Sequence, residues 1–379
     1  MAEAPVQTEA LKESVRESAR EAQAWKSPYE EWKQSQGLPT LRGLGVDNVY
    51  TAELTPWKER GGSGVFVNLD GTGGFNDTYL HEIPPKQSLQ PLRHIYEATV
   101  FILKGQGATT IWINDQKKQT FEWHENSYFA IPPNAWYQHH NVSGSEPARF
   151  VAMTGAPRVI DTFKNLDFVF DNPFVFSDRF DGEDGYFKET PQTRSRGGWA
   201  TNFVADVLEA SVRKTHAEGG PTWDRAIGGF GTAFSMVNST VRSHSSGWAV
   251  GTYKKAHRHG PGIHVLILKG TGHSLMWLEN QPVARIDWGP GSMFVPPEMW
   301  FHQHFNTSAE PVLFLAIGWG TDKPKLGGKQ YVYISTKLGG DQIEWEEEDP
   351  AVHREFEAAL EANGARCQMG EHHPFCTYK

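Results

Sequence analysis

Cysteine and long apolar runs are both scarce in this 379-residue sequence. The two cysteines, Cys367 and Cys376, lie near the C-terminus, which excludes a disulfide framework and favours a cytoplasmic protein with reduced thiols. No run of about 18 apolar residues occurs, the length that a membrane-spanning helix needs, and the segment 1–25 has no apolar signal-peptide core. The sequence therefore predicts a cytoplasmic protein without a membrane partner.

Positive charge is also in short supply. The chain has 36 Lys and Arg against 45 Asp and Glu, a formal net charge of −9, which argues against nucleic acid as a partner. No GxGxxG follows a strand, so nucleotide binding has no support. What the sequence does contain is 38 Gly, 23 Pro and 12% aromatic residues, a composition typical of an all-β protein of two domains.

Two stretches of the chain, residues 92–153 and 248–318, alternate short apolar runs with Gly, Asn or Pro turns, as in a β-sandwich or barrel. These stretches are copies of each other. FILKGQG at 101–107 matches LILKGTG at 266–272, and with one residue of slippage before the proline pair, IPPNAWYQHHN matches VPPEMWFHQHFN. An internal duplication of this length predicts two copies of one domain.

Five histidines gather in the second copy: His257, His259, His264, His302 and His304. In a strand, alternate side chains share a face, so His257 and His259 point one way, as do His302 and His304. Neutral imidazole is the commonest protein ligand of first-row divalent metals. The spacing therefore predicts a metal site, although any one of these histidines taken alone is more often structural.

The repeat divides these histidines into two kinds. It places His259 opposite His94 and His304 opposite His140, so both copies share these two. The other three have no histidine opposite them: His257 faces Leu92, His264 faces Thr99, and His302 faces Gln138. The site is therefore expected in the second copy alone, and His304 is expected to have a structural role.

Both copies resemble cupin domains, and the chain resembles a bicupin. The first motif of this family is G(X)5HXH(X)3-4E(X)6G. In HRHGPGIHVLILKG the HXH is His257 and His259, and His264 stands after four intervening residues where the family has Glu.

The second family motif, G(X)5PXG(X)2H(X)3N, is matched by GSMFVPPEMWFHQHFN. Gly291, Pro297, His302 and Asn306 fill their places, and Met299 stands where the family has Gly. The resemblance implies an all-β fold of two cupin domains, each a double-stranded β-helix or jelly roll.

The resemblance also implies a ligand set, with His257, His259 and His302 on the metal and His264 as a fourth ligand or a catalytic base. His304 is the next candidate for a catalytic role. The pattern is most similar to gentisate and hydroxynaphthoate dioxygenases, which bind iron(II) through three histidines. This similarity implies one Fe(II) per chain, dioxygen, and C–C cleavage of an aromatic or enolic small molecule.

Two other hypotheses stay open at this point. A non-oxidative hydrolase, lyase or isomerase could use Zn, Mn or Ni at the same ligands as a Lewis acid. A noncatalytic bicupin is disfavoured, because only the first copy has lost its ligands.

The expected organisation is as follows: an N-terminal helical arm at 1–37, a first cupin domain without metal at 38–160, a linker at 161–198, a second cupin domain with the metal site at 199–335, and a C-terminal helix and tail at 336–379. The charged arm is a candidate contact in a homo-oligomer. The tail holds His372 and His373 near Cys376, which predicts adventitious metal affinity at most.

Overall fold

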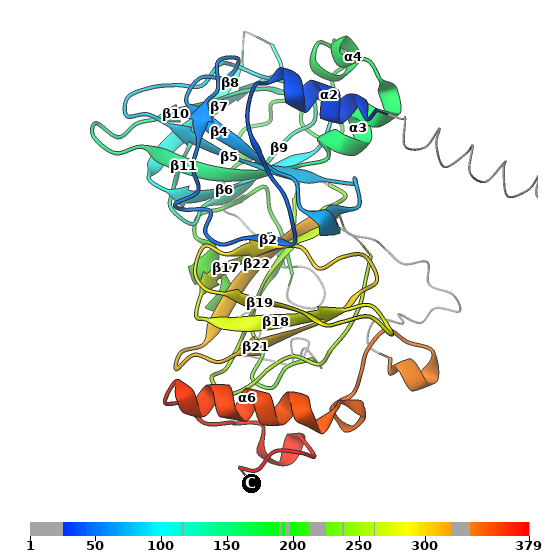
Figure 1. Ribbon diagram of the computed structural model, residues 1–379. Coiled ribbons are helices and arrows are strands. Elements are labelled where there is room, and N and C mark those ends of the chain that lie inside the picture. The colour runs from blue at the N-terminus through cyan, green and yellow to red at the C-terminus, as the bar shows by residue number, and fades with distance from the viewer. Residues whose placement is uncertain are drawn as a thin grey trace, which may run out of the picture.

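The computed structural model describes residues 26–114, 117–188, 192–193, 198–212, 225–236, 239–260, 262–319 and 334–378. Two β-barrels lie one above the other, with a C-terminal helix beneath the second (Figure 1). The prediction of an all-β chain with two similar domains is confirmed. None of the helices in the described ranges is long and apolar enough to cross a membrane.

The first barrel consists of an eight-stranded sheet, order β1-β4-β5-β11-β6-β9-β14 with β3 on β4, and a three-stranded sheet, order β10-β7-β8. Its strands are β1 Thr40–Leu41, β3 Thr55–Pro56, β4 Ser63–Val67, β5 Asp77–Ile83, β6 Ala98–Lys104, β7 Gln106–Trp112, β8 Lys118–His124, β9 Tyr128–Ile131, β10 Trp136–Asn141, β11 Ala148–Thr154 and β14 Phe203–Val204.

The second barrel repeats this plan with an eight-stranded sheet, order β12-β13-β15-β16-β22-β17-β20-β2, and a three-stranded sheet, order β19-β18-β21. Its strands are β2 Gly45–Val46, β12 Gln192–Thr193, β13 Trp199–Ala200, β15 Ala233–Ser235, β16 Val241–Trp248, β17 Ile263–Lys269, β18 Gly272–Trp277, β19 Ala284–Trp288, β20 Met293–Phe294, β21 Phe301–Asn306 and β22 Val312–Trp319.

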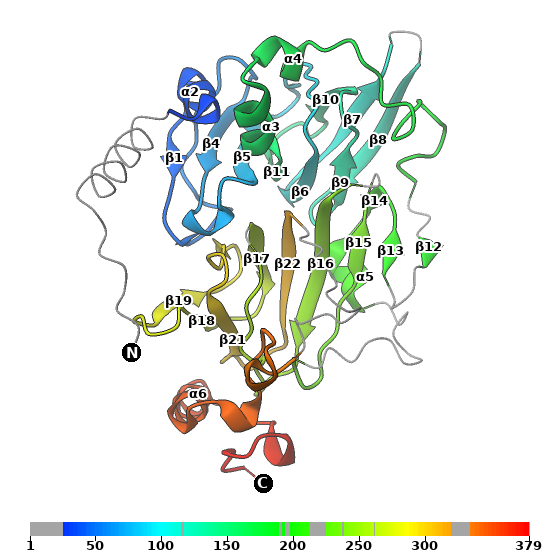
Figure 2. The same cartoon turned by 90° about the vertical axis from the view of Figure 1, so that its right-hand side faces the viewer.

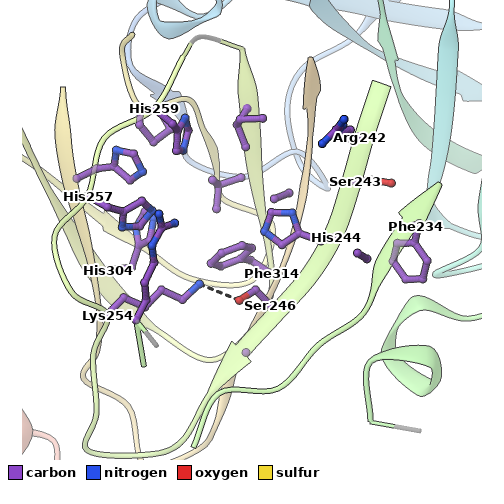
Figure 3. Close-up of a pocket in the computed structure, with 18 of the residues that line it drawn as sticks. Phe234, Arg242, Ser243, His244, Ser246, Lys254, His257, His259, His304 and Phe314 are labelled. Carbon is purple, nitrogen blue, oxygen red and sulfur yellow. Dashed lines mark hydrogen bonds between the residues drawn. The ribbon is translucent and has the colours of Figure 1, made fainter. Parts of the chain in front are cut away.

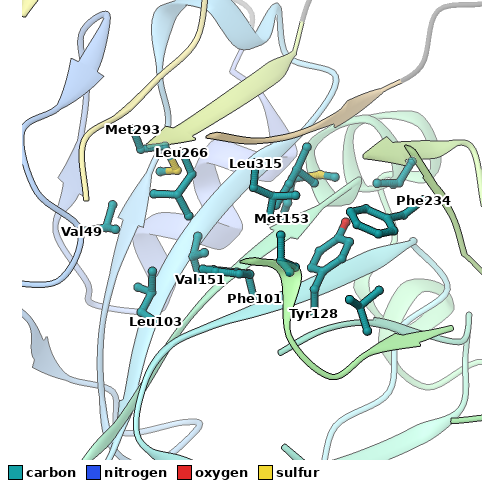
Figure 4. Close-up of a cluster of buried hydrophobic side chains, with 14 of the residues drawn as sticks. Val49, Phe101, Leu103, Tyr128, Val151, Met153, Phe234, Leu266, Met293 and Leu315 are labelled. Atoms are coloured by element: carbon teal, nitrogen blue, oxygen red, sulfur yellow. The ribbon is translucent and has the colours of Figure 1, made fainter. Parts of the chain in front are cut away.

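The two barrels are not consecutive in the sequence, because each includes a short strand from the part of the chain that forms the other. Strand β2 comes from the N-terminal part of the chain but pairs with β20 of the second barrel (Figure 1). Strand β14 comes after β13 of the second barrel in the sequence but pairs with β9 of the first barrel (Figure 2). The eight-stranded sheets also share a hydrophobic core, where Phe101 and Val151 of the first barrel belong to the same cluster as Leu266 and Leu315 of the second (Figure 4). Burial of this shared surface stabilises the pair as one unit.

In the sequence, the described helices lie near the ends of the chain and between the two strand repeats. They are α2 Pro28–Ser35, α3 Ala156–Phe163, α4 Leu166–Phe170, α5 Val207–Val212 and α6 Pro350–Ala362, with the 3-10 turns η1 Asp70–Thr72, η5 Thr336–Leu338, η6 Trp345–Glu347 and η7 Gly370–His372. Helices α3 and α4 lie beside α2 on the first barrel (Figure 1). The predicted C-terminal helix is thus confirmed as α6, with Asp349 as its N-cap. Most of the predicted N-terminal helix falls in residues 1–25, outside the described residues.

Strand pairing fixes how the two copies align. In the first barrel Gly107 pairs with Asn141, and in the second Gly272 pairs with Asn306. Because Gly107 and Gly272 are counterparts in the repeat, Asn141 and Asn306 are counterparts as well. The one-residue slippage therefore lies after these asparagines, in the loops that follow β10 and β21, and its predicted place before the proline pair was wrong.

This alignment changes two predicted counterparts. His302 stands opposite Tyr137 rather than Gln138, and His304 stands opposite His139 rather than His140. The other pairs agree with the prediction, since Leu92 bridges Tyr137 in the first barrel as His257 bridges His302 in the second.

Candidate metal centre and cavity

Three of the predicted histidines meet inside the second barrel. His257 and His259 lie in the extended segment before β17, and His302 lies on β21. His257 and His302 are joined through the backbone, where His257 N donates to His302 O at 3.1 Å and His302 N donates to His257 O at 2.8 Å. Backbone pairing of the two segments therefore brings these side chains together.

The hydrogen bonds of the three rings set their tautomers. Nδ1 of His257 and of His302 contacts the backbone carbonyl two residues earlier, at 3.0 and 3.1 Å, and Nδ1 of His259 contacts the next carbonyl at 2.8 Å. A carbonyl oxygen only accepts, so each Nδ1 carries the proton and each neutral ring keeps a lone pair on Nε2. This is how a histidine is held when it binds a metal through Nε2.

The distances also suit one ion. The ring centroids of His257 and His302 are 4.3 Å apart, those of His259 and His302 are 4.6 Å apart, and those of His257 and His259 are 5.9 Å apart. Their ligand atoms all lie within 4.8 Å of one another. The three neutral imidazoles therefore fit a first-row divalent metal, and they leave coordination positions open for a substrate.

His264 does not join this group. It lies on β17 between Ile263 and Val265, which both line the cavity beside the three histidines, so strand alternation turns His264 to the other side of the sheet. It is buried there, and no described residue makes an ordinary hydrogen bond to either ring nitrogen. The residue that faces the ligands is Ile263, and the cluster has no fourth ligand at the motif's acidic position.

The placement of His264 predicts that His264→Leu keeps the barrel metal and turnover. An apolar side chain of similar size removes two buried polar atoms that make no ordinary hydrogen bond to the described residues, which is neutral or stabilising. Metal analysis and a thermal unfolding curve of the purified variant check this expectation. Loss of the metal in a variant that is folded would make His264 a ligand after all.

His304 lies near the ligands but is held by other partners. Its Nδ1 contacts Ser274 Oγ at 2.7 Å, and Trp288 Nε1 donates to the same oxygen at 2.9 Å. In the first barrel, His139 Nδ1 contacts Thr109 Oγ1 at 2.7 Å. Because the barrel without the ligand set holds its histidine in the same way, the arrangement indicates a structural role for His304.

The first barrel retains one of the three ligand positions. His94 is the counterpart of His259, whereas Leu92 and Tyr137 occupy the positions of His257 and His302. Nε2 of His94 contacts the Tyr137 hydroxyl at 3.1 Å. Among the described residues, no group of metal-binding side chains lies in this barrel.

A cavity of about 710 Å³ opens beside the three histidines (Figure 3). Arg225, Arg242 and Lys254 line it, and none of the described residues that line it is Asp or Glu. In a chain with a net charge of −9, this wall is locally basic. Positive side chains around a confined site attract and hold anions.

Comparison with known proteins adds to this picture. Residues 79–154 match the cupin domain family. The first barrel has the cupin fold. The second barrel has the same strand order and the matching register, so the chain has the bicupin fold. No curated protein matches the chain.

Solved structures with a similar fold include oxalate decarboxylases. A Bacillus subtilis oxalate decarboxylase studied for its Mn(II) centres is 13% identical, with a TM-score of 0.47 over 74% of this chain and 78% of that one. A deletion mutant of the Bacillus subtilis enzyme is also 13% identical, with a TM-score of 0.47 over 73% and 76%. At this distance the similarity concerns the fold alone.

Several cavity residues of the second cupin barrel were not predicted, and each replaces a different kind of residue in the first. Strand pairing places Arg242 opposite Asp77 and His244 opposite Tyr79. Lys254 stands opposite Leu89, since Lys254 N donates to His304 O as Leu89 N donates to His139 O. A comparison of the two copies at every cavity position, rather than at histidines alone, would have pointed to them.

Lys254 is buried in this wall. Its Nζ donates to Ser246 Oγ at 2.8 Å and lies 4.7 Å from the ring centre of Trp248 and 4.3 Å from that of Phe314 (Figure 3). Burial and the positive charge of Arg225 lower the pKa of Lys254 well below 10.5. The side chain is thereby shifted toward the neutral amine, which can accept a proton.

The backbone explains the one departure in the second motif. Met299 has φ +59°, in the left-handed region that favours Gly, and its N–H donates to His259 O at 2.9 Å. Its counterpart Asn134 has φ +56° and donates to His94 O at 2.7 Å. The turn that supports His259 therefore keeps its geometry without Gly.

Proposed function

We propose that the second cupin barrel is the active site of a metal-dependent enzyme that acts on a small molecule with a carboxylate or similar anionic group. One observation supports this most strongly. Two ligand histidines, His257 and His302, and two basic cavity residues, Arg242 and Lys254, occur together in the second barrel, and all four are replaced in the first.

The metal would be held by His257, His259 and His302. A divalent ion there supplies a Lewis acid that polarises a substrate oxygen. Zinc, nickel and iron all accept imidazole ligands, so the expected cofactor is one divalent metal in the second barrel of each chain.

The arginines of the basic wall would bind the anionic end of the substrate, with Lys254 beside them shifted toward its neutral amine. Arg242 is exposed on β16, and Lys254 is buried deeper in the cavity. Arg225 also lines the cavity, and its charge lowers the pKa values of both His257 and His244. Arg225 has a counterpart in the first barrel, Arg60, because the carbonyl oxygens of both residues accept equivalent backbone hydrogen bonds. Arg242 and Lys254 therefore distinguish the second barrel from the first better than Arg225 does.

Proton transfer is the chemistry that the remaining residues favour. Lys254 is shifted toward its neutral form, and burial together with the charges of Lys254, His259 and Arg225 lowers the pKa of His244 to about 3. With a pKa of about 3, His244 is neutral but too weak a base to take a proton near neutral pH, so Lys254 is the candidate proton acceptor in the cavity. This favours a non-oxidative hydrolase, lyase or isomerase reaction, in which a base and a Lewis acid act together.

An iron(II) dioxygenase is the second candidate. Among the described residues the cluster consists of three histidines and no carboxylate, which is the ligand set implied by the resemblance to ring-cleaving dioxygenases. The same open positions would then take an aromatic or enolic substrate and dioxygen.

Turnover without oxygen separates the two candidates. The protein, reconstituted separately with Fe(II), Mn(II), Ni(II) and Zn(II), is assayed under nitrogen and in air against a panel of small carboxylates, which includes salicylate and gentisate, and of their uncharged analogues. We expect a carboxylate to be converted equally well under nitrogen. Consumption of one dioxygen per turnover, with no product under nitrogen, would assign the dioxygenase. Activity confined to uncharged compounds would contradict the anionic substrate.

A further inference from the structure

The C-terminal tail folds back beneath the second barrel and forms a second polar cluster there. Helix α6 and the tail pack around Tyr253 and Phe305 of the barrel, together with Trp345, Phe356 and Met369. Within this apolar cluster lie two buried, free cysteines, Cys367 and Cys376.

Four potential ligands converge at this point. His353 and Glu357 are one turn apart on α6, so they share a face of the helix. His353 Nε2 lies 3.2 Å from Glu357 Oε1 and 3.7 Å from Cys367 Sγ, and the two Sγ atoms lie 3.3 Å apart. All four ligand atoms lie within 4.8 Å of one another, and all four residues are buried.

We propose that His353, Glu357, Cys367 and Cys376 form a structural zinc site that fastens the C-terminal tail to α6. Zinc in closed structural sites is four-coordinate, with bonds of about 2.3 Å to sulfur and about 2.0–2.2 Å to nitrogen and oxygen. A tetrahedron with these bonds places its ligand atoms roughly 3.3–3.8 Å apart. The separations of 3.2, 3.7 and 3.3 Å are close to this geometry.

The hydrogen bonds around His353 set its tautomer for this role. Tyr253 OH lies 2.6 Å from Glu348 Oε1 and 2.9 Å from His353 Nδ1. The carboxylate accepts the only proton of the hydroxyl, so His353 Nδ1 donates to the tyrosine oxygen. In the neutral ring Nε2 then presents a lone pair to a carboxylate oxygen and two sulfur atoms, an arrangement that a cation between them stabilises.

The fourth ligand is also held in place. Thr377 N donates to Glu357 Oε1 at 2.8 Å, and Thr377 Oγ1 donates to Oε2 at 2.9 Å. Bonds of this kind orient ligands around metals in proteins. Zinc would bind the two thiolates, so the two thiol protons leave for solvent when the ion enters.

A neighbouring group, Glu348, His353 and His373, is a poorer metal site. The Tyr253 hydroxyl occupies its centre, at 2.6, 2.9 and 2.8 Å from the three side chains. A metal there would have to displace this oxygen. Its hydrogen bonds instead hold the His353 ring of the zinc site in place from the side of the barrel.

Cobalt distinguishes this site from the barrel site, because only the tail site offers sulfur. The full-length protein, purified under reducing conditions and stripped of metal, is titrated with Co(II). We expect a thiolate-to-cobalt charge-transfer band in the wild type, the same band in His302→Ala, and none in Cys367→Ser/Cys376→Ser. Protein isolated with zinc should lose about one equivalent of zinc per chain in the double cysteine variant.

The wild type and His302→Ala test the tail zinc site even if the double cysteine variant does not fold. Absence of the charge-transfer band in both proteins would overturn the site. A Cys367–Cys376 disulfide found by mass spectrometry in protein kept reduced throughout would overturn it as well. Loss of the barrel metal in His302→Ala has no bearing on the band, so this test is independent of the proposed enzyme function.

Discussion

His302→Ala is expected to lose the barrel metal and all measurable turnover, whereas Tyr137→Ala is expected to keep both. The two residues occupy the same position in the two barrels, so the substitutions remove comparable side chains from comparable sites. Only His302 has partners that make a ligand set, since its ring lies 4.3 Å from that of His257 and 4.6 Å from that of His259. Two remaining imidazoles are too few for tight binding of a divalent ion.

Metal content per chain and steady-state rates of both variants check this prediction. A second matched pair, His259→Ala and His94→Ala, should give the same contrast. The tail site contributes its own zinc, so the expected loss is one equivalent per chain rather than all bound metal. Full metal content and normal turnover in His302→Ala would show that the site lies elsewhere.

Lys254→Leu is expected to keep the barrel metal but to lower kcat by about 10²–10⁴-fold, the usual contribution of a general acid or base. Leu is the residue of the first barrel at this position, Leu89, so the change is compatible with the fold. The substitution removes the buried amine that lies beside Ser246 and leaves the three histidines unchanged.

Lys255→Leu is the matched control for this variant. Lys255 is the next residue, but its Nζ pairs with Glu344 instead of lining the cavity. We expect it to retain kcat. If Lys254→Leu also retained kcat, with only KM raised, Lys254 would bind the substrate without transferring a proton.

The repeat is the reason why so much of the fold was predictable. Two copies of the same apolar and turn pattern predicted two similar barrels, and the HXH and its partner motif predicted His257, His259 and His302. Their convergence depends on backbone pairing between the segment before β17 and strand β21, which the motif spacing reflects.

His264 shows what spacing alone could not settle. The family motif allows three or four residues before its acidic ligand, and the two choices differ by one position, which in a strand means opposite faces. Of the two residues at these positions only His264 can bind a metal, so the residue type favoured the histidine. Pairing of β17 with β22, however, directs Ile263 into the cavity. A single-residue uncertainty of this kind reverses the predicted role of a side chain.

Lys254 and the zinc ligands of the C-terminal tail were not predicted, for a different reason. Lys254 precedes the motif by a few residues, in a segment where regular alternation fails, so its direction could not be deduced. The tail ligands come from a helix and an irregular loop, and Cys367 and Cys376 are too far apart for a familiar zinc-binding spacing. The approach of His353 to these cysteines depends on how α6 packs against Tyr253.

Anomalous diffraction from crystals of the full-length protein, collected on both sides of the absorption edge of the metal found by elemental analysis, tests the central claim most directly. The three-histidine centre predicts a peak between Nε2 of His257, Nε2 of His259 and Nε2 of His302. A metal-loaded, active protein with no peak there, or with its peak beside His94 in the first barrel, would contradict the assignment.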